Sequence, residues 1–517
     1  MKKKINVILN KYVYFTLSLF LIMLSARISA QTSIHQAASE GNVEMLEKLI
    51  KGGTPVDARD NDSLTPLMYA LLDDQADAVE FLINAGANVH TVDGEGTAVL
   101  FYAIESGSTE MVEILLKKNV RKDLLNASGY PPVIVAIDAG DEMLDFLLSN
   151  GFDINAKDVN GMTVLSHLIE NKDFERARLV VEKGADVNSF TEEKMPVLTF
   201  VYRFGNMDFF NYLLSRKPNL NLVDEDKKTL LMYVLEKGNT ILARQLIESG
   251  AEVNVKDRWE QSVFFYALYN TDEDFMLYLL TKGASAEGKS KTGDIALNLA
   301  IEKGYTRLAT ELINKGLSTK ARDRNNRSPL LVAAASGNLP LVRLLVEKGA
   351  ALNEAFNDGK TLLMFVAASP RTTPEVVEFL IQKGQKVNPQ DFHGVSALML
   401  AAKSGNPEVV KKLIDYGADF GAEDEDGKTV LLYAAEGGNT EIVKYLVEVN
   451  GRSVYLTDKK NKWTALHYAA ANGHLDVVKY LISQKATLNA PDVNGKTPFQ
   501  VASTSQVKEF LSSLGAY

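Results

Sequence analysis

The chain of 517 residues contains no cysteine, which excludes disulfide bonds, thiol catalysis and cysteine metal ligands. Its six histidines are scattered and form no His-x-x-x-His pair, so no zinc ligand set is recognisable. A Gly-x-Ser-x-Gly nucleophile elbow is also missing. We therefore predict a protein without metal, cofactor or catalytic activity, whose fold depends on side-chain packing alone.

Residues 1–30 have the pattern of a secretory signal peptide. Lys2, Lys3 and Lys4 precede an apolar run over residues 12–24, and small residues follow up to Ala30. The run is shorter than the roughly 20 residues that a membrane-spanning helix needs. We predict cleavage near Ala30 and a periplasmic or secreted protein, with an uncleaved anchor as the alternative. The pattern looks bacterial, although a eukaryotic secretory signal also fits.

Acidic side chains outnumber basic ones, 66 to 56, and the net charge is −10. This charge disfavours binding to nucleic acid or to an anionic membrane surface. It favours a protein partner that carries a basic patch.

The body of the chain repeats one pattern, a small or apolar residue that closes a hexapeptide resembling Thr-Pro-Leu-x-x-Ala. Eleven of the fourteen steps between these residues are 33 residues long, one is 32 and two are 35. The fifteen positions are Ala37, Ala70, Ala103, Ala136, Leu168, Val201, Val234, Ala267, Ala300, Ala333, Val366, Ala401, Ala434, Ala469 and Ala502. Such a constant period predicts a stacked repeat array.

Each repeat is predicted to contain two antiparallel helices and a hairpin. Around Ala401, Gly405 is placed to end a first helix, and Asn406 with Pro407 is placed to start a second. The second helix then ends in Gly-Ala, as at Gly417. An acidic, turn-rich stretch such as Asp424-Glu425-Asp426-Gly427 follows and predicts the hairpin between repeats.

Several phrases carry a resemblance to a known family. They are Thr65-Pro66-Leu67-Met68, Gly184-Ala185-Asp186-Val187-Asn188, Thr464-Ala465-Leu466-His467 and Thr497-Pro498-Phe499. With these phrases the chain resembles the ankyrin repeat family from residue 34 to 517. The resemblance implies an all-α solenoid of about 15 units and a protein-binding role. A tetratricopeptide array has a similar period but lacks the Gly-Ala hairpin.

The predicted organisation is a signal peptide over 1–30 and one continuous solenoid over 31–517. The ends of the solenoid, at about 31–62 and 496–517, have the features of caps. Leu116-Lys117-Lys118-Asn119 and Leu214-Ser215-Arg216-Lys217 lack the glycine that normally ends the second helix.

One segment matches a nucleotide-binding motif. Residues Gly283 to Ser290 fit G-x-x-x-x-G-K-S, which would place Lys289 and Ser290 at a phosphate. A phosphate loop needs a strand before it and a helix directly after it, whereas the repeat pattern puts a helix before it and a hairpin after it. A nucleotide-binding enzyme is therefore a remote alternative.

Aromatic residues provide the candidate partner contacts. Trp259 and Trp463 fall outside the repeat framework and on the predicted hairpins, as do Phe392 and His393. A second group precedes the register residue in eight of the fifteen repeats and includes Tyr266, Tyr433 and Tyr468. These tyrosines are predicted either as core between repeats or as a partly exposed ladder. The alternative role for the tryptophans is packing against the adjacent hairpin.

We predict an exported, monomeric, non-catalytic scaffold that binds a protein along a concave face made of hairpin tips and first helices. A secreted effector that acts on host proteins is the alternative.

Overall fold

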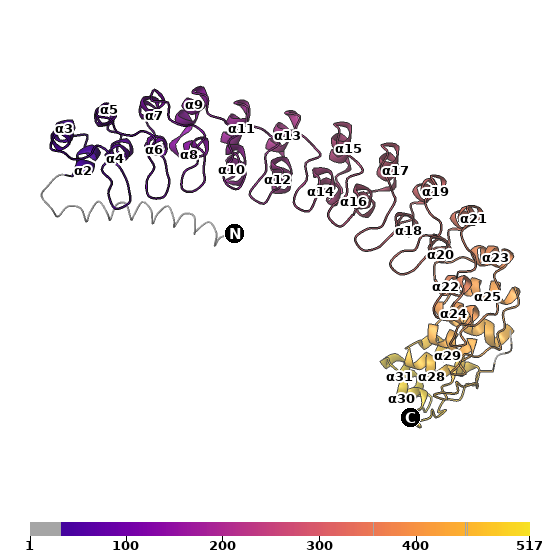
Figure 1. Cartoon of the computed structure of the whole chain (residues 1–517). Coiled ribbons are helices and arrows are strands. Elements are labelled where there is room, and N and C mark those ends of the chain that lie inside the picture. Colours follow the sequence, from indigo (N-terminus) through magenta and orange to yellow (C-terminus); the bar gives the residue numbers. More distant parts are fainter. Residues whose placement is uncertain (1–32, 355, 450, 452) are drawn as a thin grey trace. The chain divides into compact units, whose positions relative to one another are not determined.

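The computed structural model describes residues 33–354, 356–449, 451 and 453–517. The chain divides into two compact units, Met1–Glu225 and Asp226–Tyr517. Within the described residues the first unit is a stack of six helix pairs and the second a stack of nine (Figure 1). The predicted signal peptide and its cleavage site near Ala30 lie outside the described residues.

The first unit alternates short first helices with slightly longer second helices. Its first helices are α2 (Ile34–Ser39), α4 (Pro66–Leu72), α6 (Val99–Glu105), α8 (Pro132–Ala139), α10 (Val164–Glu170) and α12 (Val197–Phe204). Its second helices are α3 (Val43–Lys51), α5 (Ala76–Asn84), α7 (Thr109–Leu116), α9 (Asp141–Ser149), α11 (Phe174–Glu182) and α13 (Met207–Ser215).

The second unit has the same alternation. Its first helices are α14 (Leu230–Glu236), α16 (Val263–Asn270), α18 (Ala296–Glu302), α20 (Pro329–Ala335), α22 (Leu362–Ala367), α24 (Ala397–Ser404), α26 (Val430–Gly437), α28 (Ala465–Ala471) and α30 (Pro498–Val501). Its second helices are α15 (Thr240–Glu248), α17 (Glu273–Thr281), α19 (Thr306–Asn314), α21 (Leu339–Glu347), α23 (Pro374–Gln382), α25 (Pro407–Asp415), α27 (Thr440–Lys444) with the π-helical η1 (Tyr445–Val449), α29 (Leu475–Ser483) and α31 (Ser505–Ser513).

The predicted helix signals act where the sequence places them. Gly405 ends α24 in the left-handed conformation, with φ of 81°. The Asn406 side chain then accepts a hydrogen bond from the Val409 N–H and caps α25. Pro407 occupies the first turn of α25, where a missing N–H costs nothing. The repeat pattern therefore predicted the helix pair correctly.

Two of the junctions that lack the glycine after the second helix show that the backbone is kept without it. Asn119 and Lys217 have φ of 57° and 55°, in the left-handed region that glycine normally fills. For residues with a side chain this conformation costs roughly 1–2 kcal/mol. The surrounding stack therefore imposes the turn at these two positions.

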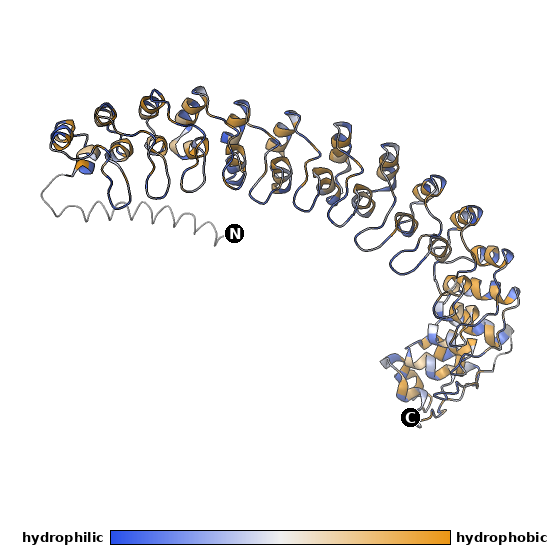
Figure 2. Cartoon of the chain, in the orientation of Figure 1, coloured by the Kyte–Doolittle hydropathy of each residue, from blue (hydrophilic) through white to orange (hydrophobic). Residues whose placement is uncertain are grey.

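The core lies between the helices of each stack. First helices pack against neighbouring first helices, as α24 does against α26, and each also packs on its own second helix. The helices carry most of the apolar residues and the connecting loops are largely polar (Figure 2). In the outermost second helices fewer side chains are buried, only Leu46 in α3 and only Val507 and Leu511 in α31. Capping helices are expected to have this distribution.

The hairpins extend from the first-helix side of each stack (Figure 1). Several are closed at the base by one antiparallel bridge, as between Lys256 and Ser262 or Glu423 and Thr429. The described residues contain such isolated bridges but no extended strand. None of the helices in this part of the chain combines the length and apolar character that a bilayer crossing requires.

Candidate protein-interaction surface

Most hairpins are organised by one aspartate at their base. In the hairpin after α15, one oxygen of the buried Asp257 carboxylate accepts the N–H groups of Trp259 and Gln261, at 2.8 and 2.9 Å. Its other oxygen accepts the hydroxyl of Tyr266 on α16 at 2.7 Å. The same hydroxyl-to-carboxylate bond joins Tyr69 to Asp60, Tyr102 to Asp93, Tyr433 to Asp424 and Tyr468 to Asp458. These five tyrosines, which we call the tyrosine stripe, therefore connect each of these hairpins to the first helix that follows it.

The candidate tyrosines expose little surface. Tyr266 and Tyr433 are buried and Tyr468 is half-buried. Burial, and then the neighbouring aspartate, raises the pKa of each of the three hydroxyls. These residues position the hairpins, and their rings offer a partner little area.

A buried lysine fills the space between two of these rings. The Lys428 ammonium lies 4.3 Å from the ring centre of Tyr433 and 4.1 Å from that of Tyr468, and it pairs with Glu436. Burial lowers the pKa of Lys428, while the hydrogen bond to Glu436 opposes that shift. This part of the stripe is interior packing between repeats.

Trp463 also packs locally. Its indole N–H donates to the Asp492 carboxylate of the next hairpin at 3.2 Å. Its ring stacks on His467 with centres 5.9 Å apart and meets the edge of Tyr468 at 5.2 Å. The alternative predicted for the tryptophans, packing against the adjacent hairpin, describes this residue.

Trp259 and Phe392 are different, because both rings face solvent at hairpin tips. Trp259 is 48% exposed and Phe392 is 75% exposed. The Arg258 guanidinium lies 5.4 Å from the Trp259 ring centre. The Phe392 ring lies against Gly359, where a Cβ atom would come within 2.6 Å of it. Since Gly359 also has φ of 78°, a larger residue there would displace Phe392.

His393 lies beside Phe392 at the same tip. Its Nδ1 is 2.7 Å from the Glu425 carboxylate of the next hairpin. This hydrogen bond raises the pKa of His393 and thereby favours its charged form. The ring is exposed and available to a partner.

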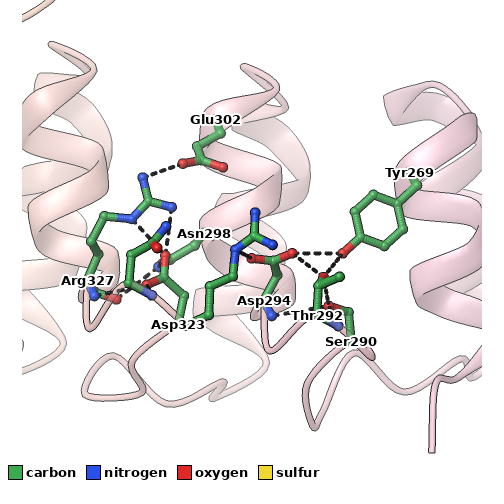
Figure 3. Close-up of polar contacts among 10 residues, drawn as sticks. Tyr269, Ser290, Thr292, Asp294, Asn298, Glu302, Asp323 and Arg327 are labelled. Atoms are coloured by element: carbon green, nitrogen blue, oxygen red, sulfur yellow. Dashed lines mark hydrogen bonds and ion pairs between the residues drawn. The ribbon is translucent and has the colours of Figure 1, made fainter. Parts of the chain in front are cut away.

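Two hollows open on the hairpin and first-helix side of the second unit. One, of about 320 Å³, is lined by His393, Lys360, Lys403, Asp424 and Tyr433 among others. The other, of about 340 Å³, is lined by Tyr269, Lys291, Thr292, Asp294 and Arg324 among others. In the second hollow Asp294 accepts hydrogen bonds from Tyr269 and Thr292 and pairs with Arg324 (Figure 3).

The sequence interpretation missed Lys291 and Arg324. The signal that could have found them is their spacing, because Arg258, Lys291 and Arg324 follow one another at intervals of 33 residues and each comes directly after the first residue of its hairpin turn.

Comparison with known proteins identifies the family. A model described as ankyrin repeats (3 copies) matches overlapping segments that cover residues 17–191 and 198–516. The chain belongs to the ankyrin repeat family. Ankyrin repeat proteins generally mediate protein–protein interaction.

Solved ankyrin structures resemble parts of the chain. The crystal structure of the human ASB11 ankyrin repeat domain aligns at 25% identity, with a TM-score of 0.37. The alignment covers 43% of this chain and 98% of that domain. No curated protein sequence matches the chain.

The G-x-x-x-x-G-K-S segment has a structural role in the ankyrin hairpin. Ser290 takes the position of the hairpin aspartate, and its hydroxyl accepts the N–H groups of Thr292 and Asp294 at 3.2 and 3.1 Å. The preceding element is α17, and the next helix, α18, begins only at Ala296. No helix N-terminus therefore follows Lys289 and Ser290 directly, and the nucleotide alternative has no geometric support.

Two histidines serve the ankyrin framework. His467 and His474 hydrogen-bond to the carbonyl oxygens of Lys496 and Glu436. Among the described residues, no three potential ligands come together as a metal site would require.

Proposed function

We propose that this ankyrin repeat protein is an exported, non-catalytic scaffold that binds another protein through its hairpin tips and first helices. The observation that carries the proposal is the exposure of Trp259 and Phe392 at hairpin tips. Large apolar rings in solvent are typical anchors of protein interfaces. The family generally mediates protein–protein interaction, which supports the same conclusion.

The charge of the surface suggests the chemistry of the partner. Glu425 and Asp426 extend from the hairpin next to Phe392, and the chain as a whole has a net charge of −10. We expect a partner with a basic patch around an apolar pocket, bound by a monomer of this chain. Nucleic acid is not an expected partner.

Co-purification with anchor variants tests the binding face. The tagged chain is recovered from its own source, and bound proteins are quantified by mass spectrometry. We expect Trp259→Ala with Phe392→Ala to reduce partner recovery by more than about tenfold, because anchor residues contribute roughly 2 kcal/mol or more. Ile241→Ala is the matched control, since Ile241 is 82% exposed but lies on the second helix α15.

Equal partner recovery by the Trp259→Ala/Phe392→Ala double variant and by the Ile241→Ala control would contradict the proposed binding face. Trp463→Ala is expected to lower stability rather than recovery, because the indole is engaged by Asp492.

Export is a separate part of the proposal and rests on residues 1–30. N-terminal sequencing of the protein from cell fractions should find a chain that begins at Gln31 in the periplasm or the medium. An intact Met1 in the cytosol would contradict export. Recovery inside a host cell would favour the effector alternative over a resident scaffold.

A further inference from the structure

Three successive hairpins of the second unit present a basic residue at one equivalent position. Arg258, Lys291 and Arg324 each follow the first residue of the hairpin turn and are exposed. The three residues belong to consecutive repeats, in a chain whose net charge is −10. We call these three residues the basic row. Arg258 pairs with Asp226 at 2.8 Å and Arg324 with Asp294 at 3.3 Å, so part of this positive charge is already balanced.

Two carboxylates line the hollow behind the basic row, those of Glu236 and Asp294, and both are already engaged. Glu236 pairs with Lys228 at 2.7 Å. Asp294 accepts the hydroxyls of Tyr269 at 3.0 Å and Thr292 at 2.7 Å (Figure 3). It also lies 3.3 Å from Nε of Arg324. Asp294 is buried, so little of it remains to attract a cationic ligand.

The same hollow also contains donors that are not engaged by these carboxylates. Lys291 has no ion-pair partner for its ammonium group within the described residues, and only Nε of Arg324 is engaged. Gln261 is 3% exposed, and its side-chain oxygen accepts the Lys291 N–H at 3.2 Å. The Gln261 amide N–H₂ group has no partner among the described residues, although it lines the hollow. A ligand oxygen in the hollow could accept a hydrogen bond from this group.

We infer that the basic row and its hollow bind an acidic segment of the partner protein, with one carboxylate side chain in the hollow. This inference rests on the proposed scaffold function and adds the chemistry of one contact. Adjacent repeats lie about 10 Å apart, as packed helices do. An extended chain advances about 3.3 Å per residue, so acidic residues three positions apart would face successive members of the row.

An acidic peptide fits this surface better than a nucleic acid does. The row spans only three hairpins, and the exposed Glu260 and Glu287 lie within the same stretch. A duplex carries a charge about every 1.7 Å and would meet these carboxylates as well. A short segment with spaced carboxylates can avoid them.

Fluorescence anisotropy with a synthetic peptide tests the inference on the purified chain. The probe is a labelled peptide with blocked ends, glutamate at every third position and Gly-Ser between them, measured at low salt. We expect saturable binding that disappears when glutamine replaces glutamate. Lys291→Gln and Arg324→Gln should each weaken binding about tenfold, the size of one charge-assisted hydrogen bond.

Lys459→Gln is the matched control, because Lys459 holds the same position in a distant hairpin and its side chain is 72% exposed. We expect it to change the peptide affinity less than about twofold. Equal weakening by Lys459→Gln, or equal binding of the glutamine peptide, would overturn the inference. Tighter, Lys291-dependent binding of a DNA duplex would overturn it in favour of a nucleic acid.

The assay needs no natural partner, so its outcome is independent of the co-purification test. If the peptide does not bind, the inference of an acidic segment is wrong, but the proposed role of Trp259 and Phe392 is unaffected. If the co-purification test instead contradicts the role of Trp259 and Phe392, a measured affinity for the peptide remains valid.

Discussion

At the scale of single residues, each hairpin depends on a few side chains that bridge it to a helix. His467 shows how specific these bridges are. Its Nδ1 accepts the Thr464 N–H at 3.2 Å, and its Nε2 donates to the Lys496 carbonyl at 3.2 Å. This pattern requires a neutral ring, since a proton on Nδ1 would face the Thr464 N–H. Burial lowers the pKa of His467 in agreement with the pattern.

The stability of the chain should therefore depend on pH through His467. A depressed pKa in the folded state means that the unfolded ring binds its proton first. The stabilisation is complete above the ordinary value of 6.5 and is lost as the pH falls below it. Thermal unfolding between about pH 7.5 and 5.5 should show a steeper loss for the natural chain than for His467→Gln.

Glutamine is the suitable replacement because Gln500 holds the equivalent position in α30, where its oxygen accepts the Thr497 N–H at 3.0 Å. Identical pH slopes for the two proteins would show that His467 does not titrate on unfolding in this range.

At the scale of helices, the Gly-Asn junction both starts the second helix and ties it to the previous repeat. Asn439 caps α27 by accepting the N–H groups of Glu441 and Ile442. Its amide N–H₂ group donates to the Gly405 carbonyl of the preceding repeat at 2.9 Å. Asn406 makes the same pair of contacts, to Val409 and to the Thr372 carbonyl. One residue thus couples two repeats.

Asn439→Ala should destabilise α27 by about 2 kcal/mol, because it removes both a cap and a hydrogen bond between repeats. Asn239→Ala is the control, since Asn239 caps α15 through the Leu242 N–H and its amide reaches no other repeat within the described residues. We expect it to cost about half as much. Hydrogen exchange of the two second helices measures both changes, and equal costs would contradict the coupling.

These elements were predictable because their signals are local. Gly405, Asn406 and Pro407 specify a helix junction through backbone preferences that need no distant partner, and the period of 33 residues specifies the stack. The exposure of an aromatic ring was not predictable in this way. Trp463 finds a carboxylate 29 residues away on the next hairpin, whereas Phe392 lies against Gly359 and stays in solvent. Such differences arise between hairpins, so only the structure separates the two.

At the scale of the whole molecule, charge is distributed unevenly over the candidate face. The net charge of −10 favours approach of a basic partner, while the basic row provides one local contact of opposite sign. Long-range charge mainly affects how fast partners meet, and buried aromatic contacts mainly affect how long they stay.

The association rate constant with the natural partner should therefore fall as ionic strength rises from about 0.05 to 0.5 M, because salt screens charges beyond the Debye length of about 10 Å. Phe392→Ala should leave that rate nearly unchanged and should increase the dissociation rate. Surface plasmon resonance separates the two constants. A salt-independent association rate would show that the acidic surface has no role in partner encounter.

The central claim is that the hairpin tips, and not the second helices, contact the partner. A photo-crosslinking amino acid placed at Phe392, and in a second protein at Ile241, tests it directly in the native source, since both side chains are exposed at 75% and 82%. We predict a specific crosslinked protein from position 392 and none from position 241. The same crosslinked protein from position 241, without one from position 392, would contradict the claim.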